Sequence, residues 1–308
     1  MKQTLKEEAI GLKLEELMLP ADYRSVVNDY LSPIADDLQL LLSAPNRCAH
    51  REPLILGIQG PQGSGKSTCS EFLKLLLAYE HQLNAVVLSM DDFYLSHEER
   101  KQLADKEHPL LKTRGVPGTH DIQLALDTIN KLGKLNDKQS ISVPRFDKST
   151  DDRFPEEQWQ QVSGPVDIII LEGWCVALRP QSPTEIKQAV NDLEVNNDPC
   201  GKWRNYVNAC LAGNYQELFS LIDKLIIFKP PSFDCVYQWR LKQEQKLLVS
   251  LANAGAGKKI RTFSPKELKH FIAHYQRLTE HALKTLPEKA DWCISLDNNQ
   301  QILNIKKR

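Results

Sequence analysis

A glycine-rich stretch near the start of the chain limits the possible folds most strongly. Residues 60–67, Gly-Pro-Gln-Gly-Ser-Gly-Lys-Ser, fit the phosphate-binding pattern G-x-x-x-x-G-K-[ST]. The apolar run LILGI at 54–58 precedes this loop, and an amphipathic stretch over 66–80 follows it. A strand–loop–helix unit of this kind surrounds a phosphate with backbone N–H groups and a helix N-terminus. The sequence therefore predicts a P-loop.

We expect this loop to bind the phosphates of ATP. The Lys66 ammonium should reach the β- and γ-phosphates, and the Ser67 hydroxyl should be a ligand of Mg²⁺. A glycine-rich turn with an unrelated lysine is the alternative, and it is disfavoured because an expected strand and helix flank the loop. The predicted ATP-binding residues are Gly60, Pro61, Gln62, Gly63, Ser64, Gly65, Lys66, Ser67 and Thr68.

Short apolar runs alternate with helical patterns along the rest of the chain. Most runs lack the strict alternation of a half-exposed strand, which is typical of strands buried on both faces of a parallel sheet. The βαβα order predicts an α/β fold of the P-loop NTPase type, with a doubly wound, mostly parallel sheet and flanking helices. Strands are expected at 54–58, 85–89, 166–172, 224–228 and 291–296, and helices at 66–80, 121–133, 185–194, 203–221, 235–251 and 264–284.

Two adjacent carboxylates, Asp91 and Asp92, follow the second expected strand. In open α/β sheets, ligands bind beyond the carboxyl ends of the strands. A carboxylate there can accept the proton of an acceptor hydroxyl while the γ-phosphoryl group departs, so we expect Asp91 to be a general base. Asp92 and the nearby Tyr94 are expected to contact the acceptor. The alternative is that one aspartate caps a helix.

The third expected strand, 166–172, ends in Glu172 and is followed by Gly173. A carboxylate at that strand tip can hold Mg²⁺ directly or through water, and the glycine leaves room beside the P-loop. A helix-capping glutamate is the alternative. We expect Ser67 and Glu172 to form the metal site.

The bulk composition excludes several classes of function. The formal net charge is −1, so no bulk attraction to nucleic acid or to an acidic membrane surface is expected. No run of 18 apolar residues occurs, so no membrane span is expected. The seven cysteines are scattered and lack a CxxC pair, which is typical of reduced thiols in a cytoplasmic protein. The sequence does not indicate an oligomeric state.

P-loops serve GTPases, motors and kinases. GTPases commonly read guanine with an Asn-Lys-x-Asp stretch, and none occurs in this chain. No motor-length extension is present either. A compact kinase that uses ATP, Mg²⁺ and a small-molecule acceptor fits the motifs best.

Several segments carry a family resemblance. The P-loop, MDDFY, VPRFDKS and ILEGW resemble the small-molecule kinases that include phosphoribulokinase, uridine kinase and bacterial pantothenate kinase. The segments LLKTRGVPGTHD, PRFDKSTDDRFP and PSFDCVYQWRLKQE resemble, more specifically, the D-glycerate 3-kinase family of plants and its fungal and bacterial relatives. This likeness runs from about residue 50 to 300. It implies that ATP and D-glycerate react to give ADP and 3-phosphoglycerate.

The resemblance also implies residue roles. Asp91 matches the presumed base of the wider group, and Lys66 belongs with it among the catalytic residues. A mobile lid in that group supplies arginines to the phosphates, and the matching segment here is VYQWRLKQEQK. Arg240 is therefore the lid candidate, with Lys242 as a weaker one. The wider group often has two closely spaced arginines there, whereas this chain has one.

A site for glycerate needs a cationic fork for the carboxylate and acceptors for the hydroxyls. Arginine suits a planar carboxylate because its donors match both oxygens. Either Arg114 or Arg145 is expected in that role, and the choice between them stays open. The predicted substrate-binding residues also include His120, Asp147 and Lys148. For His120 the alternative is a structural role at the start of a helix.

The expected organisation has two parts and one insertion. Residues 1–50 have apolar residues at helical spacing, which indicates an N-terminal helical extension packed on the core. Residues 51–308 form the P-loop kinase domain. Residues 179–221 are longer than a strand connection needs and are expected to form a helical cap beside the acceptor site.

Two alternatives remain at this point. A kinase of the same fold could act on another acceptor, such as a nucleoside or pantothenate, because acceptor pockets diverge while the phosphate machinery stays. The acceptor-side segments are rich in Arg, Lys and Asp, which favours a small anion. A non-catalytic ATP-binding regulator is disfavoured by the presence of Lys66, Ser67, Asp91 and Glu172.

Overall fold

The computed structural model describes residues 2–44, 52–253 and 264–308, and the domain boundary expected at residues 50 and 51 lies outside them. In the first half of the chain the elements are α1 (Lys2–Glu16), α2 (Tyr23–Val26), α3 (Ser32–Leu42), β1 (Leu54–Gln59), α5 (Lys66–His81), β2 (Ala85–Ser89), α6 (His97–Lys106), α7 (Ile122–Gly133), β3 (Ser140–Val143), β4 (Phe146–Asp147) and β5 (Asp152–Arg153). In the second half they are β6 (Gln160–Ser163), β7 (Ile168–Gly173), α8 (Pro183–Lys187), α9 (Asp192–Asn197), α10 (Lys202–Ala212), α11 (Asn214–Ser220), β8 (Lys224–Lys229), α12 (Asp234–Asn253), α13 (Pro265–Thr285), β9 (Trp292–Leu296) and β10 (Ile302–Lys307).

The central sheet confirms the predicted fold class. Its six strands have the order β10-β9-β8-β1-β7-β2, and every neighbouring pair is parallel except β9 and β10. The strand before the P-loop, β1, lies between β7 and β8. At the carboxyl edge, Gln59 pairs with Gly173, and Ser89 pairs with Glu172. This register brings the P-loop, the segment after β2 and the tip of β7 to one edge of the sheet.

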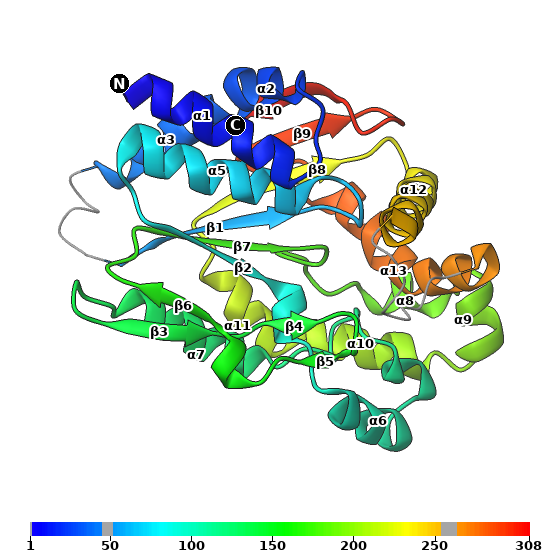
Figure 1. The fold of residues 1–308 in the computed structure, drawn as a ribbon. Coiled ribbons are helices and arrows are strands. Elements are labelled where there is room, and N and C mark those ends of the chain that lie inside the picture. Colours follow the sequence, from blue (N-terminus) through cyan, green and yellow to red (C-terminus); the bar gives the residue numbers. More distant parts are fainter. Residues whose placement is uncertain (1, 45–51, 254–263) are drawn as a thin grey trace.

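Helices cover both faces of this sheet (Figure 1). On one face lie α1, α3 and α5, and on the other lie α7, α10 and α11. Alternate residues of β1 enter the two hydrophobic cores: Leu54, Leu56 and Ile58 pack with α1, α3 and α5, whereas Ile55 packs with α7 and α11. Both faces of the strand are buried, which explains its continuous apolar sequence. None of the described helices is long and apolar enough to cross a membrane.

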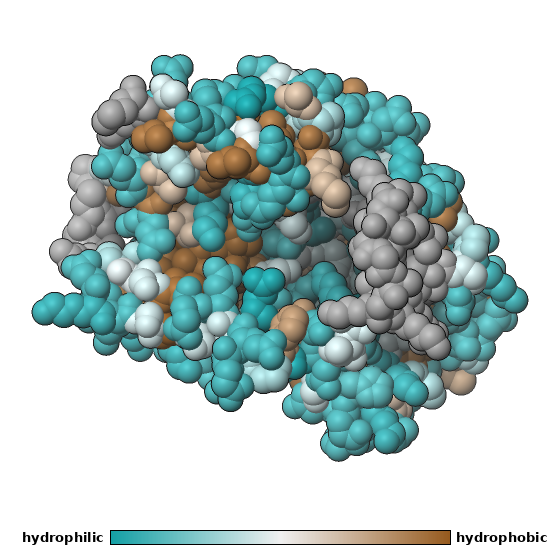
Figure 2. All heavy atoms as spheres, viewed as in Figure 1, coloured by the Kyte–Doolittle hydropathy of each residue, from teal (hydrophilic) through white to brown (hydrophobic). Residues whose placement is uncertain are grey.

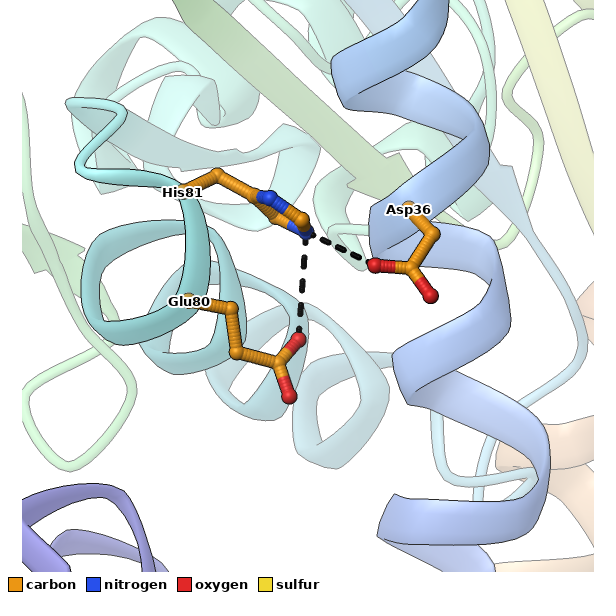
Figure 3. Close-up of side chains that lie close together, drawn as sticks. All are labelled: Asp36, Glu80 and His81. Atoms are coloured by element: carbon orange, nitrogen blue, oxygen red, sulfur yellow. Dashed lines mark ion pairs between the residues drawn. The ribbon is translucent and has the colours of Figure 1, made fainter. Parts of the chain in front are cut away.

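The N-terminal helices pack on the helix that follows the P-loop. Contacts join α5 to both α1 and α3. At the end of α5, His81 Nε2 lies 3.0 Å from the Asp36 carboxylate on α3, a contact that is an ion pair when the imidazole is protonated (Figure 3). Lys6 of α1 reaches Glu80 of α5 at 2.8 Å. Figure 2, which has the same view as Figure 1, shows hydrophobic residues at the surface on the left, in the region of α1, α3 and α5.

Some helix boundaries differ from the expectation. The helix predicted over 185–194 is two short helices, α8 and α9, because the Asn191 side chain begins a new helix by accepting from the Glu194 N–H. The helix predicted over 203–221 breaks at Gly213 into α10 and α11. Helix α6 was not predicted, because it buries only Arg100 and Ala104 and so has no apolar stripe.

A buried ion pair holds the 179–221 segment to α13. The guanidinium of Arg277 donates to both carboxylate oxygens of Glu194, at 2.7 and 2.6 Å, and also to the carbonyls of Glu185 and Gln188. The two side chains are only 7% and 1% exposed. Because α13 also carries residues of the cavity described below, this pair connects the segment to the candidate site.

We expect Arg277→Met to destabilise the protein by about 3–5 kcal/mol, because it leaves the Glu194 carboxylate buried without its cation. Urea denaturation followed by circular dichroism measures this loss. Lys269→Met, which makes the same chemical change at an exposed position of α13, should alter stability by no more than about 0.5 kcal/mol. A loss below about 1 kcal/mol for Arg277→Met would show that the pair does not hold the two segments together.

Candidate active site

The P-loop has the backbone that its glycines predict. Gly63 and Gly65 have φ values of +78° and +94°, in the left-handed region that favours glycine, and Gly65 is the N-cap of α5. Gly60 is needed for a different reason: an added Cβ would lie 2.6 Å from the Ser64 hydroxyl and 2.7 Å from Phe228. The loop therefore curls tightly against β8 and opens at the start of α5.

Polar groups inside this loop suit an anion. The Lys66 ammonium donates to the Pro61 carbonyl at 3.1 Å, and among the described residues this is its only hydrogen bond. Burial lowers the pKa of Lys66, while the carboxylates of Glu172 and Asp91 act in the opposite direction. The buried Ser64 hydroxyl has no hydrogen-bond partner in the described part of the chain. A phosphate in the loop would satisfy both groups.

Ser67 and Glu172 lie together beside the loop. The Ser67 hydroxyl, in the first turn of α5, donates to Glu172 Oε1 at 3.0 Å. Glu172 is 6% exposed at the tip of β7. A hydroxyl and a carboxylate are oxygen ligands of the kind that Mg²⁺ prefers, so the donor set fits this ion.

Asp91 lies just past β2 with both of its carboxylate oxygens engaged. The Tyr94 hydroxyl donates to Oδ1 at 2.8 Å, and the Lys148 ammonium donates to Oδ2 at 2.6 Å. Burial acts to raise the pKa of Asp91, but Lys148, Tyr94 and Lys66 together hold it well below the usual aspartate range. The side chain is therefore ionised at neutral pH. The short 3-10 helix Met90–Phe93 follows β2, and its N-cap is Ser89, not Asp91.

These groups share one cavity of about 210 Å³. Charged, polar and aromatic side chains all contribute to its lining. The lining residues are Gln62, Gly63, Lys66, Ser67, Asp91, Tyr94, Arg114, Lys148, Glu172, Gly173, Trp174, Arg240, Phe271 and Tyr275. Of the predicted residues, the structure thus brings Lys66, Asp91, Tyr94, Arg114, Lys148, Glu172 and Arg240 together.

Arg114 enters the cavity on a tightly packed loop. Its guanidinium pairs with Asp151 and lies 5.5 Å from the ring centre of Phe146. Its carbonyl accepts from the Tyr275 hydroxyl at 3.1 Å. The next residue, Gly115, has a φ of +138°, and an added Cβ would lie 2.2 Å from that hydroxyl. This glycine therefore allows Arg114 and Tyr275 to meet.

Four predicted substrate residues lie outside this cavity, and three of them share a second cavity. Asp92, Arg145 and Asp147 line a neighbouring cavity of about 470 Å³. Asp92 accepts from the Phe146 N–H at 3.1 Å and lies 3.6 Å from Arg145. Asp147 accepts from the N–H and hydroxyl of Ser149 in its own turn. These contacts shape the β4–β5 hairpin.

His120 is buried beneath Tyr94. Its Nδ1 lies 2.6 Å from the Tyr215 hydroxyl, and its ring stacks on Tyr94 at 4.5 Å between ring centres. Burial lowers the pKa of His120 to about 4, so the imidazole is neutral at pH 7. Asp121 caps α7 through the Leu124 N–H. In this arrangement His120 supports the ring of Tyr94 and does not line the cavity.

Comparisons with known proteins were made for both sequence and structure. No protein-family model matches the chain. The uncharacterized kinase mug58 of Schizosaccharomyces pombe is 33% identical over 250 residues, which cover 77% of this chain and 83% of that protein. The probable ATP-dependent kinase TDA10 of Saccharomyces cerevisiae is 30% identical, with 85% and 90% covered. Chloroplastic D-glycerate 3-kinase of Arabidopsis thaliana is also 30% identical, with 89% of this chain but 58% of that protein covered.

The chain belongs to the family of P-loop kinases that includes D-glycerate 3-kinase. It is therefore an ATP-using phosphotransferase with an alcohol acceptor. Among solved structures, D-glycerate 3-kinase from Cryptococcus neoformans has a TM-score of 0.73, with 24% identity and coverage of 92% of this chain and 99% of that one. This likeness shows the shared fold.

Three aromatic residues of the kinase cavity were not among the predicted site residues. Trp174 directly follows the Glu172-Gly173 pair at the tip of β7, so its place after the strand was a usable signal. Phe271 and Tyr275 are four residues apart on α13 and share one face of that helix. That spacing alone does not indicate a cavity, because such a pair is typical of a helix core.

The pH dependence of stability should report on Asp92. Burial raises the pKa of Asp92 to about 6, against the opposing effects of the Phe146 N–H and Arg145. The folded kinase therefore binds more protons than the unfolded chain between pH 4 and pH 6, and this group loses stability as pH rises through that window.

We expect Asp92→Asn to gain free energy of unfolding relative to the wild type as pH rises from about 4 to 7, by up to about 2 kcal/mol. The amide oxygen can still accept from the Phe146 N–H. Urea denaturation at several pH values measures the difference, and Asp105→Asn, at an exposed position of α6, provides the control. A difference that does not change with pH would contradict the raised pKa.

Proposed function

We propose that the protein transfers the γ-phosphoryl group of Mg-ATP to a hydroxyl of D-glycerate and forms 3-phosphoglycerate. One observation carries this proposal: a guanidinium, an ionised carboxylate and the P-loop lysine line the same small cavity. This cavity of about 210 Å³ shares Ser67, Asp91, Lys148 and Glu172 with the neighbouring cavity of about 470 Å³, so the guanidinium, and not the volume, favours a small anionic acceptor. The plant relative named D-glycerate 3-kinase supports the choice of glycerate.

In this proposal the P-loop binds the triphosphate. Backbone N–H groups of residues 60–68 and the Lys66 ammonium bind the β- and γ-phosphates. Ser67 and Glu172 hold Mg²⁺, which would neutralise phosphate charge as the group transfers. Arg240 lines the same cavity from α12 and contributes positive charge to the transferred group. Lys242, the weaker lid candidate, is exposed and is not among the lining residues.

Arg114 is the proposed ligand of the glycerate carboxylate. Its Nη1 is held by Asp151, whereas its Nε and Nη2 have no hydrogen-bond partner among the described residues. Nε and Nη2 form one edge of the guanidinium, and two donors on one edge can bind both oxygens of a carboxylate. Arg145 lines the neighbouring cavity, which shares Asp91 and Lys148 with this one. Arg114 lines the cavity that also contains Lys66 and Arg240, so Arg114 is the better of the two candidates.

Asp91 is the proposed general base. Its ionised carboxylate can accept the proton of the glycerate hydroxyl as that oxygen bonds to the γ-phosphorus. The hydrogen bond from Tyr94 fixes the plane of the carboxylate, and the His120 ring stacked on Tyr94 limits the movement of that phenol.

A nucleoside acceptor is the second candidate. The rings of Tyr94, Trp174, Phe271 and Tyr275 line the cavity, and aromatic rings of this kind can stack on a base. The presence of Arg114 argues for the smaller, anionic acceptor.

A cytoplasmic location is also proposed, since the six cysteines of the described chain are all free thiols.

The decisive assay measures ADP release with Mg-ATP and a panel of D-glycerate, pantothenate, uridine and ribulose 5-phosphate. We expect turnover with D-glycerate, with 3-phosphoglycerate as the product identified by ³¹P NMR, and loss of turnover when EDTA removes Mg²⁺. Turnover with uridine alone would support the nucleoside candidate. ADP release with none of the four would contradict the proposed acceptor class.

Two variants should separate the roles of base and carboxylate ligand. We expect Asp91→Asn to lower kcat by about 10²–10⁴ with little change in the KM for glycerate, because the base is lost. Arg114→Met should instead raise the KM for glycerate by at least about tenfold, because a charge-assisted contact is lost. Steady-state kinetics measures both. Equal effects of the two variants on kcat and KM would contradict this division of roles.

A further inference from the structure

A lysine on the β4–β5 hairpin reaches the candidate base from the surface. Lys148 lies in the turn of this hairpin, and its side chain is 60% exposed. Its ammonium nevertheless lies 2.6 Å from Asp91 Oδ2, and it lines the same cavity as Arg240 of α12. This is its only hydrogen bond among the described residues.

Both carboxylate oxygens of the candidate base are engaged in the arrangement that the structure shows. Tyr94 donates to one oxygen of Asp91, and Lys148 donates to the other. A carboxylate that is ion-paired and hydrogen-bonded at both oxygens is a poor proton acceptor. Each oxygen can still accept a further hydrogen bond, so loss of the ion pair is not needed for a substrate hydroxyl to bind, but it would make Asp91 a stronger base.

Lys148 is the partner that can leave. Tyr94 is 3% exposed and is stacked on His120, so its phenol is fixed in place. Lys148 has a flexible four-carbon side chain in a largely exposed turn. The terminal phosphate of ATP carries more negative charge than a single carboxylate, and it would bind in the same cavity.

The hairpin itself is anchored to two residues that follow Asp91. The Asp92 carboxylate accepts from the Phe146 N–H of β4, and Arg153 of β5 donates to the Tyr94 carbonyl at 3.1 Å. The residues next to the base therefore position the hairpin. The turn presents Lys148 at a constant place, and only its side chain has to move.

We propose that Lys148 passes from Asp91 to the γ-phosphoryl group when ATP binds, which makes Asp91 a stronger base and supplies a second cation in addition to Arg240. This inference rests on the proposed phosphoryl transfer. In that step the acceptor oxygen bonds to the γ-phosphorus, the bond from phosphorus to the ADP oxygen breaks, and the hydroxyl proton goes to Asp91. Lys148 stays protonated throughout. The single arginine of the α12 segment then acts with a lysine of the β4–β5 hairpin.

The test compares nucleotides that differ only in the terminal phosphate. Isothermal titration calorimetry, in the presence of Mg²⁺, measures the affinity of the full-length protein for ADP and for a non-hydrolysable ATP analogue. We expect Lys148→Met to weaken binding of the triphosphate analogue by about tenfold or more, since a charge-assisted contact is lost, and to leave ADP binding within about twofold. Lys148→Arg, which keeps the positive charge, should retain most of the triphosphate affinity.

Lys138→Met is the matched control, because Lys138 is an exposed lysine in the turn before β3. Its ammonium makes no hydrogen bond or ion pair with the described residues. This variant should bind both nucleotides like the wild type. Equal weakening of ADP and triphosphate binding by Lys148→Met would overturn the proposal, and so would unchanged triphosphate binding. The binding test needs no acceptor, so it is separate from the acceptor panel: an incorrect acceptor leaves the calorimetric result unaffected.

Discussion

The register of three parallel strands decides where the groups of the candidate site meet. β7 lies between β1 and β2, and it pairs Gln59 with Gly173 and Ser89 with Glu172. The P-loop begins one residue after β1, and Asp91 lies two residues after β2. A one-residue slip of β7 would turn Glu172 to the opposite face of the sheet and away from Ser67. Close packing of both faces against helices opposes such a slip, because each side chain fits its own position in the core.

The charges at this edge are mutually dependent. Lys66 is buried, so burial favours its neutral form, and the nearby carboxylates of Glu172 and Asp91 oppose that effect. Asp91 is in turn kept ionised by Lys148, Tyr94 and Lys66. Removing one member would leave another charge poorly compensated in a partly desolvated site. This alternation of cations and carboxylates suits a triphosphate with its metal ion, which would bring both signs of charge into the same place.

Much of the fold was predictable from the sequence because its signals are local. The P-loop glycines, the apolar strands and the helix after the loop are properties of short segments, and the strands at 54–58, 85–89 and 224–228 begin where they were expected. The polar helix α6 and the division of 185–194 were missed, since capping side chains determine them and apolar periodicity does not. Side-chain contacts between distant segments could not be predicted either. Nothing near Lys148 in the sequence indicates its contact with Asp91, 57 residues away.

The predicted site residues show the same difference between local sequence signals and tertiary packing. Residues at strand tips and in the loop could be placed from their motifs, whereas residues of the hairpin and the 113–121 loop depend on tertiary packing. His120 and Arg114 are six residues apart, but the first is buried under Tyr94 and the second lines the cavity. Their residue types alone could not separate a supporting residue from one that faces the cavity.

The most direct measurement is a crystal structure of the protein with Mg²⁺, a non-hydrolysable ATP analogue and D-glycerate. The account predicts that the triphosphate lies in the P-loop and that the glycerate carboxylate binds Arg114. It also predicts that a glycerate hydroxyl lies within hydrogen-bond distance of Asp91 and faces the γ-phosphate. Glycerate bound away from Arg114, or an Asp91 carboxylate turned away from the γ-phosphate, would contradict it.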